Sequence, residues 1–236
     1  MLKTFIISPP FGNYISRSWA TSVHGTFTLA PRPGLLKQTV KTFRPIKGGW
    51  INQIGFRNKG IKNVDFSMDI ARSRLISVAG LSGNDDWLQI LEEIPAECMV
   101  EINVGCPNVS NYSIPNHILL AYLSKFAFVS LKIPPTEAAL YRAIDAHHHV
   151  GIQYVHMSNT LPTKRGGESG RRLRSVNLPL IKRMRTMAPE INIIGGGGIY
   201  SAWDLKSYKN AGANHFSLST VWFTPWKIRQ IKKIID

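Results

Sequence analysis

The sequence predicts an α/β protein folded as a closed (β/α)8 TIM barrel, with residues 1–236 forming a single domain. Three observations lead to this fold class. The chain has 236 residues, within the roughly 200 to 250 that one such barrel commonly occupies. Short β-branched runs alternate with segments of helical period, and polar motifs directly follow several of the runs. Because a barrel carries its reactive residues at the C-terminal ends of its strands, the pattern also predicts where a site lies.

Eight apolar runs are expected to form the barrel strands. They are Thr4–Ser8, Thr21–Phe27, Leu75–Ala79, Met99–Val104, Phe128–Ile133, Tyr154–Met157, Ile191–Ile194 and His215–Ser219. Segments of helical period between them predict helices. These are Asp86–Glu93, Asn116–Lys125, Glu137–His149, Leu178–Met187, Ala202–Asn210 and Trp226–Ile235. The segment 30–59, rich in proline, glycine and basic residues, is expected to be a long structured loop.

Composition indicates a globular, cytoplasmic protein. Hydrophobic residues make up 44% of the chain and charged residues 18%, which allows a large core and gives no case for disorder. No apolar run approaches the ~20 residues of a membrane span, and the apolar start before Pro9 is too short for a signal peptide. Cys98 and Cys106 are expected to be free thiols, because their spacing suits neither a zinc site nor a disulfide framework. No metal site is expected.

The formal net charge of +15 raises the local concentration of anions such as phosphates, carboxylates and nucleic acid. Basic residues are densest in the segments 164–174, 182–185 and 227–233. The simplest interpretation is a solvated basic surface, and the alternative is a surface that binds anions or nucleic acid.

The segment Glu101–Asn108 joins a buried-strand pattern to a reactive residue type. The proline after Cys106 halts strand pairing, so this thiol is expected to project from the strand's end over the barrel mouth. A thiol there can act as a general base if nearby positive charge or dipoles lower its pKa. A free cysteine is more often a small buried hydrophobe, and Cys98 keeps that interpretation. The amides of Asn103 and Asn108 beside Cys106 favour a site.

A second motif, Asn192–Ala202, is an apolar strand that ends in four glycines before a helix. Backbone without side chains lets N–H groups approach a phosphate closely, and the helix N-terminus adds a favourable dipole. The next strand, His215–Thr220, ends in hydroxyls, and barrel phosphate sites are commonly built from the loops after strands seven and eight. The two segments together predict a phosphate site, with a simple tight turn as the alternative.

Two further segments, Gly48–Gly60 and Met157–Gly170, carry asparagines close to glycines. Asn52 or Asn159 alone would more simply be a turn residue bonded to local backbone. Neither segment supports a site without the others.

Taken in order, these segments resemble the dihydroorotate dehydrogenase family from about Thr26 to Phe223, roughly four-fifths of the chain. The matching segments are Thr28–Gly34, Ile51–Phe56, Asn103–Asn108, Leu131–Pro135, Ser158–Thr160, Gly166–Gly170, Ile193–Ile199 and Ser219–Thr220. No single motif is decisive, but their order and spacing together are specific.

The resemblance implies an FMN-dependent oxidoreductase that converts dihydroorotate to orotate in pyrimidine biosynthesis. It implies that Cys106 abstracts a proton from a ring carbon while hydride passes to flavin N5, and a positioned base is typically worth about 10² to 10⁴ in rate. The residues implied to bind the pyrimidine are Asn52, Asn103, Asn108, Asn159, Gly55, Phe56 and Thr160. Those implied to bind FMN are Asn103, Lys132, Ser158, Gly167, Gly197, Gly198, Ser219 and Thr220. Lys132 would lie at flavin N1/O2, where a cation stabilises the reduced ring.

Three departures from the family pattern stand out. Soluble relatives carry a further lysine in or just before the stretch at Gly25, and membrane-linked relatives carry one on the first βα loop; this chain has His24 and Phe11–Asn13 in those places. The chain is also shorter than typical members. Gly105 replaces the usual serine before the cysteine, which makes the motif similar to that of the tRNA-dihydrouridine synthases as well.

Two alternatives therefore accompany dihydroorotate oxidation. One is a flavin reductase acting on RNA, which the +15 charge favours, although no helical RNA-binding domain like that family's follows the last expected helix. The other is a barrel that binds FMN or a nucleotide without turnover, which the missing lysine allows. A membrane quinone is not expected as electron acceptor, because no amphipathic helix precedes Thr4; fumarate, a nicotinamide through a partner subunit, or another oxidant stays open. The resemblance also allows a homodimer.

Overall fold

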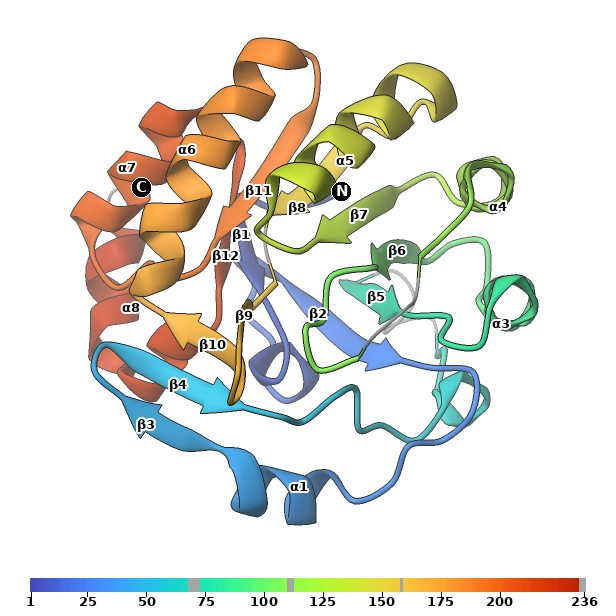
Figure 1. Ribbon diagram of the computed structural model, residues 1–236, viewed down its shortest axis with the longest axis horizontal. Coiled ribbons are helices and arrows are strands. Elements are labelled where there is room, and N and C mark those ends of the chain that lie inside the picture. Colours follow the sequence, from blue (N-terminus) through green and yellow to red (C-terminus); the bar gives the residue numbers. More distant parts are fainter. Residues whose placement is uncertain (68–72, 110–112, 158, 234–236) are drawn as a thin grey trace.

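The computed structural model describes residues 1–67, 73–109, 113–157 and 159–233, and its centre is a closed barrel of parallel strands (Figure 1). In their order around the barrel the strands are β1 (Phe5–Ile7), β12 (His215–Leu218), β11 (Asn192–Gly196), β8 (Tyr154–Met157), β7 (Val129–Ile133), β6 (Met99–Asn103), β5 (Arg74–Val78) and β2 (Ala20–Phe27). Each predicted run forms one of these strands, so the predicted (β/α)8 barrel is confirmed.

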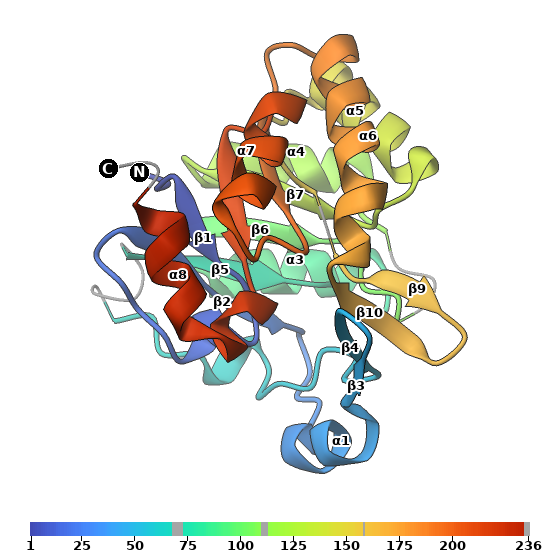
Figure 2. The ribbon, with the colours of Figure 1, turned by 90° about the vertical axis from the view of Figure 1, so that its left-hand side faces the viewer.

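Helices cover the outside of the barrel (Figure 2). They are α3 (Asn84–Glu93), α4 (Asn116–Lys125), α5 (Glu137–Val150), α6 (Arg172–Met187), α7 (Ala202–Ala211) and α8 (Pro225–Lys232). Each predicted helix is present. The predicted start of α6 at Leu178 was wrong, because the helix begins at Arg172 and continues through Pro179, a residue type that usually interrupts helices. The predicted end of the last helix, at Ile235, lies outside the described residues.

The segment 30–59, predicted as a loop, contains regular structure and corrects that prediction. It forms α1 (Leu35–Thr42), β3 (Arg44–Ile46) and β4 (Gly49–Asn52). β4 pairs with β10 (Gly166–Gly170), which also pairs with β9 (Leu161–Thr163). The resulting antiparallel sheet, β3-β4-β10-β9, lies beside the barrel and is here called the outer sheet (Figure 2). Its strands are short and their partners lie far along the chain, so local patterns do not reveal them.

The barrel interior changes from apolar to polar along its axis. A buried apolar cluster inside the barrel consists of Leu2, Ile6, Val23, Leu75 and Ile194. Toward the C-terminal ends of the strands the buried side chains include Ser77, Glu101, Asn103, Lys132 and His156. A larger apolar cluster joins the strands to the surrounding helices. The polar layer therefore lies where a barrel site was expected.

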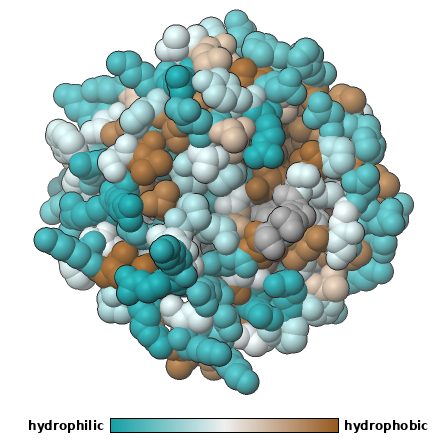
Figure 3. Space-filling view, viewed as in Figure 1, coloured by the Kyte–Doolittle hydropathy of each residue, from teal (hydrophilic) through white to brown (hydrophobic). Residues whose placement is uncertain are grey.

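The face seen in Figure 3 is mostly hydrophilic, and its hydrophobic side chains lie in separate small groups. Within the described residues no helix is both long and apolar enough to cross a membrane. Both Cys98, which is buried, and Cys106, which is partly exposed, are free thiols, as the sequence predicted.

Candidate functional site

Four asparagines that the sequence singled out form two hydrogen-bonded pairs. Asn108, in the loop after β6, donates through Nδ2 to Oδ1 of Asn52 at the end of β4, at 3.3 Å. Asn159, in the loop after β8, donates through Nδ2 to Oδ1 of Asn103 at the end of β6, at 2.7 Å. Amides both donate and accept hydrogen bonds, so two such pairs can read a planar ring whose edge alternates N–H and C=O.

In the sequence, Cys106 lies between Asn103, at the end of β6, and Asn108, in the loop that follows. Burial raises the pKa of its thiol above the ordinary value, and the backbone hydrogen bond at Asn108 and the charges of Lys132 and Arg32 oppose this only in part. The resting group is therefore a protonated thiol at neutral pH. The lowered pKa that the sequence argument required of a general base is not present in this resting geometry. Burial also raises the pKa of Cys98, to about 11.

Gly105 has a packing reason for being glycine. A Cβ at this position would lie 2.5 Å from the backbone nitrogen of Pro134, just after β7. No side chain fits there, because the loop after β6 passes directly against the loop after β7. Gly105 is the residue that makes this motif similar to that of the tRNA-dihydrouridine synthases. Close backbone packing explains why the position is glycine, so the similarity need not reflect an RNA substrate.

A buried charge network lies inside the barrel around Glu101, which is fully buried on β6. Its carboxylate oxygens lie 2.6 Å from His156 Nδ1 and 3.6 Å from Lys132 Nζ. Ser77 Oγ donates to the same carboxylate at 2.9 Å. Burial alone would raise the pKa of Glu101, but Lys132 and His156 lower it to about 2. Burial, followed by the Lys132 charge, lowers the pKa of His156, so a neutral imidazole donates its Nδ1–H to the carboxylate.

Ser77 and Thr26 connect this network to the asparagines. Their hydroxyl oxygens are 2.9 Å apart, and Thr26 Oγ1 accepts a hydrogen bond from Asn103 Nδ2, also at 2.9 Å. All three side chains are buried. No motif in the sequence pointed to Thr26, Ser77, Glu101 or His156 as site residues. The available signal was the presence of charged and hydroxyl side chains inside otherwise apolar strands.

The predicted phosphate motif lines a polar pocket at the same end of the barrel. The predicted residues among its lining are Lys132, Asn159, Thr160, Gly197, Gly198, Ser219 and Thr220. The pocket is narrow, with a volume of about 80 Å³. Gly198 has a φ of +76°, and a Cβ there would lie 2.7 Å from the carbonyl oxygen of Gly170. Bare backbone is required at this point, which suits a phosphate cradle. Ser158 lies outside the described residues.

The outer sheet brings further predicted residues to the asparagines. Gly167 on β10 pairs in register with Asn52 and donates its N–H to Asn108 Oδ1 at 3.1 Å. It therefore lies with the asparagine pair and not among the residues that line the glycine-rich pocket. Gly55 and Phe56 follow Asn52 in left-handed backbone conformations, with φ values of +61° and +55°. Their turn places the chain against the backbone of Asn108.

The two places where relatives carry a second lysine lie against each other. Asn13, in the turn after β1, accepts a hydrogen bond from Gly25 N at 2.7 Å and donates to Gly25 O at 3.1 Å. A Cβ at Gly12 would lie 2.3 Å from two carbonyl oxygens. Burial, followed by two nearby basic side chains, lowers the pKa of His24 to about 4, so this imidazole is neutral at pH 7. None of these described positions supplies the missing positive charge.

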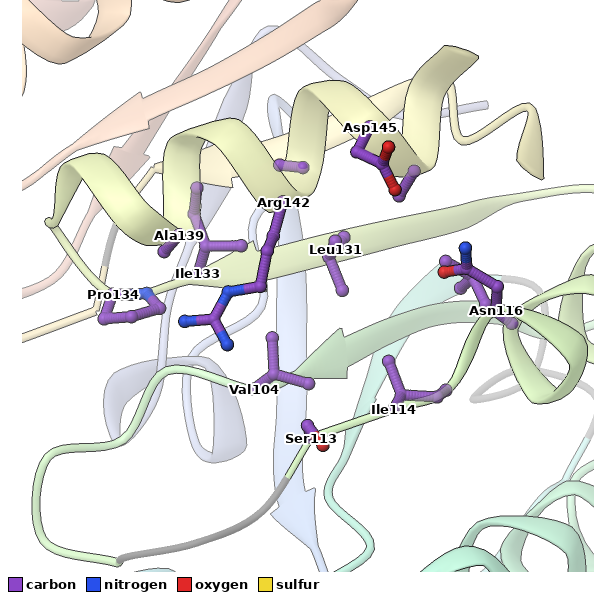
Figure 4. A pocket seen from close by; sticks show the side chains of 13 residues that line it. Val104, Ser113, Ile114, Asn116, Leu131, Ile133, Pro134, Ala139, Arg142 and Asp145 are labelled. Carbon is purple, nitrogen blue, oxygen red and sulfur yellow. The ribbon is translucent and has the colours of Figure 1, made fainter. Parts of the chain in front are cut away.

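A separate cavity of about 320 Å³ lies outside the barrel wall, between α4 and α5 and over β6 and β7 (Figure 4). Its lining is mainly apolar, and Arg142 extends from α5 toward Val104 and Pro134. None of the predicted site residues lines it. Elsewhere, no group of three or more His, Cys, Asp or Glu side chains within the described residues is arranged to hold a metal ion.

Several known proteins that are similar to this chain are dihydroorotate dehydrogenases. The family model described as dihydroorotate dehydrogenase matches residues 12–236. The chain is 28% identical to the dihydroorotate dehydrogenase (quinone) of Sodalis glossinidius, over 80% of this chain and 68% of that protein. It is 27% identical to the catalytic subunit of dihydroorotate dehydrogenase B (NAD(+)) of Listeria monocytogenes, over 88% of this chain and 79% of that protein.

Solved structures show the same fold. Dihydroorotate dehydrogenase of Eimeria tenella in complex with ferulenol superposes with a TM-score of 0.73 at 17% identity, covering 98% of this chain and 79% of that one. The ligand-free enzyme gives a TM-score of 0.71 at 17% identity, covering 98% and 82%. With the family model matched from residue 12 to residue 236, on a barrel whose motifs meet at one end, the chain belongs to the dihydroorotate dehydrogenase family.

Proposed function

We propose that this protein oxidises dihydroorotate to orotate in pyrimidine biosynthesis, with FMN as its bound cofactor. One observation carries the proposal. Two asparagine pairs, the Cys106 loop and a glycine-lined pocket that reaches Lys132 all lie at one end of the barrel. The names of the relatives support the same reaction class.

The lining of the glycine-lined pocket suits the phosphate end of FMN. Gly197 and Gly198 expose backbone, and nearby hydroxyls add donors for a terminal phosphate. Lys132, on the same pocket wall, is a cation that would stabilise an anionic reduced ring. Bound FMN would supply the two-electron acceptor. The proposed FMN-binding residues are Asn103, Lys132, Ser158, Gly197, Gly198, Ser219 and Thr220. Gly167, which the resemblance also implied, is proposed instead to hold Asn108.

The asparagine pairs suit the pyrimidine ring. Asn103 is held by Thr26 and by the Gly105 N–H, which donates to its Oδ1 at 3.2 Å. Asn108 is held by the Gly167 N–H. These bonds orient the amides before a ligand arrives, which reduces the entropy lost on binding. The proposed substrate-binding residues are Asn52, Asn103, Asn108, Asn159, Gly55, Phe56 and Thr160.

Cys106 is the proposed base. Oxidation of the dihydropyrimidine removes a proton and a hydride from adjacent ring carbons and leaves a carbon–carbon double bond. The Cys106 thiolate takes the proton, and the hydride leaves toward the bound acceptor. Because burial raises the pKa of the thiol, only a minor fraction is thiolate at neutral pH, and that fraction grows as pH rises. The charges of Lys132 and Arg32 favour the thiolate once it forms.

Anaerobic mixing of the FMN-loaded protein with dihydroorotate tests the proposal through bleaching of the flavin absorbance. Cys106→Ser should keep FMN but slow bleaching by about 10²-fold or more. Cys98→Ser changes the other thiol, buried at the start of β6, and should bleach at the wild-type rate. Unchanged bleaching in Cys106→Ser would remove this residue from the mechanism. No bleaching of the wild-type protein would exclude dihydroorotate as the substrate.

A further inference from the structure

We propose that a cationic groove beside the asparagine pairs binds the phosphate of a pyrimidine nucleoside monophosphate whose ring occupies the asparagine pocket. The inference rests on the proposed function in one respect, the use of the same ring pocket. The groove has a volume of about 460 Å³. Asn108, Gly55 and Pro107 line it, so it begins next to the asparagines and the Cys106 loop.

Three basic side chains line the groove from three separate segments. Arg32 follows β2, Arg57 follows β4, and Lys164 lies in the turn between β9 and β10. No carboxylate lines the groove, and none of these three cations is ion-paired within the described part of the chain. The chain before Asp65, which contributes half of this lining, contains no acidic residue at all. The groove therefore presents uncompensated positive charge.

Arg57 adds a specific unmet donor. Its Nε is buried without a hydrogen-bond partner, while its Nη1 reaches only the carbonyl oxygen of Pro33, at 3.4 Å. A buried donor that lacks an acceptor costs free energy, and a guanidinium lacking one costs more than a neutral group. Arg57 lines the groove, and its guanidinium matches a phosphate in shape and charge, so an anion with several acceptor oxygens there would be attracted to it.

Hydrogen bonds hold the walls of the groove in place. Arg32 Nε donates to the carbonyl oxygen of Gly55 at 3.2 Å. Gln38 on α1 donates to the Gln53 carbonyl at 2.8 Å, and the Gln53 side chain donates to the Arg165 carbonyl at 3.2 Å. These bonds join α1, the segment after β4 and the β9–β10 turn. The segments that carry the three cations are thus held against one another before any ligand binds.

The chemistry of the lining favours a mononucleotide over other anions. A carboxylate attached directly to the pyrimidine ring would lie close to the asparagines and would need only a few hydrogen-bond donors there. A phosphate carried on a sugar would extend farther from the ring, and its two negative charges suit a groove of this size lined by three cations. Single-stranded nucleic acid is generally bound along a basic track with aromatic side chains that stack on successive bases. No aromatic side chain lines the described groove. One phosphate therefore fits it better than a strand does.

Titration calorimetry of the FMN-loaded protein with UMP and with uridine, at low ionic strength, tests the proposal. UMP should bind at least about tenfold more tightly than uridine, and the difference should shrink as salt screens the groove. Arg57→Gln and Lys164→Gln should each weaken UMP about fivefold or more and leave uridine binding intact, which also shows that the variants fold. Lys182→Gln removes one exposed charge from α6, outside the groove, and should alter neither ligand.

Equal binding of UMP and uridine by the wild-type protein would overturn the proposal, as would an equal loss in Lys182→Gln. RNA oligomers that bind more tightly with each added nucleotide would also overturn it, in favour of a nucleic-acid surface. Bleaching of FMN by dihydroorotate is measured separately. If dihydroorotate bleaches the flavin but UMP binds no more tightly than uridine, only the phosphate groove is refuted. If UMP binds more tightly in a charge-dependent way but dihydroorotate does not bleach the flavin, only the proposed reaction is refuted.

Discussion

Replacing Glu101 by glutamine should destabilise the fold strongly, because it removes the negative charge from a buried network while nearly keeping the side-chain shape. The Lys132 side chain is only 8% exposed and would lose the carboxylate 3.6 Å from its Nζ. With an effective dielectric constant of about 20, two unit charges at that separation attract by about 4 to 5 kcal/mol. Breaking one partner of a buried pair typically costs about 3 to 5 kcal/mol, and we expect a loss of unfolding free energy in that range.

The double variant Glu101→Gln/Lys132→Met separates charge from shape. The second change removes the unpaired ammonium and keeps most of the side-chain volume, so much of the lost stability should return. We expect a coupling free energy of about 2 kcal/mol or more between the two positions. A buried pair can be replaced by apolar groups at little cost, whereas a lone buried charge cannot.

Guanidinium denaturation at pH 7, followed by tryptophan fluorescence, measures these differences. The FMN-free protein is the appropriate form, because a bound ligand would add its own stabilisation to the folded state. A loss of less than about 1 kcal/mol in Glu101→Gln, or two losses that simply add in the double variant, would show that charge compensation does not hold this network together.

Other predictions concern pH and the glycine-lined pocket that is proposed to bind FMN. Flavin reduction by dihydroorotate should speed up about tenfold per pH unit below the raised pKa of Cys106, since only thiolate accepts the proton; a flat stopped-flow profile would contradict this. Gly198→Ala should weaken FMN binding in fluorescence titrations at least about tenfold, whereas Gly151→Ala, at a φ of +87° with open space around it, should not. The folded state should lose stability as pH falls from about 6.5 to about 4, because the lowered pKa of His24 lets the unfolded chain bind the proton first. Denaturation midpoints of His24→Asn should show a weaker pH dependence, and an unchanged one would refute the assignment.

The amino-acid sequence by itself determined the barrel and the position of its site along the chain. Helical and strand periods are local properties, so α4 begins and ends at the predicted Asn116 and Lys125. The motif around Cys106 could be placed after a strand for the same reason. The resemblance to the dihydroorotate dehydrogenases implied that Asn103 and Asn159 would lie near each other, and parallel barrel strands do bring them together at their C-terminal ends.

Only the tertiary structure decided what depends on contacts between distant segments. The outer sheet forms because β4 meets β10, and this pairing brings Asn52 to Asn108 and closes the cationic groove. The charge of Glu101 and the protonated state of Cys106 follow from burial and neighbouring charges, which no local pattern contains. Periodicity is written in consecutive residues, whereas hydrogen-bond partners, dielectric environment and pKa are set by whichever residues the folded chain brings within a few ångströms.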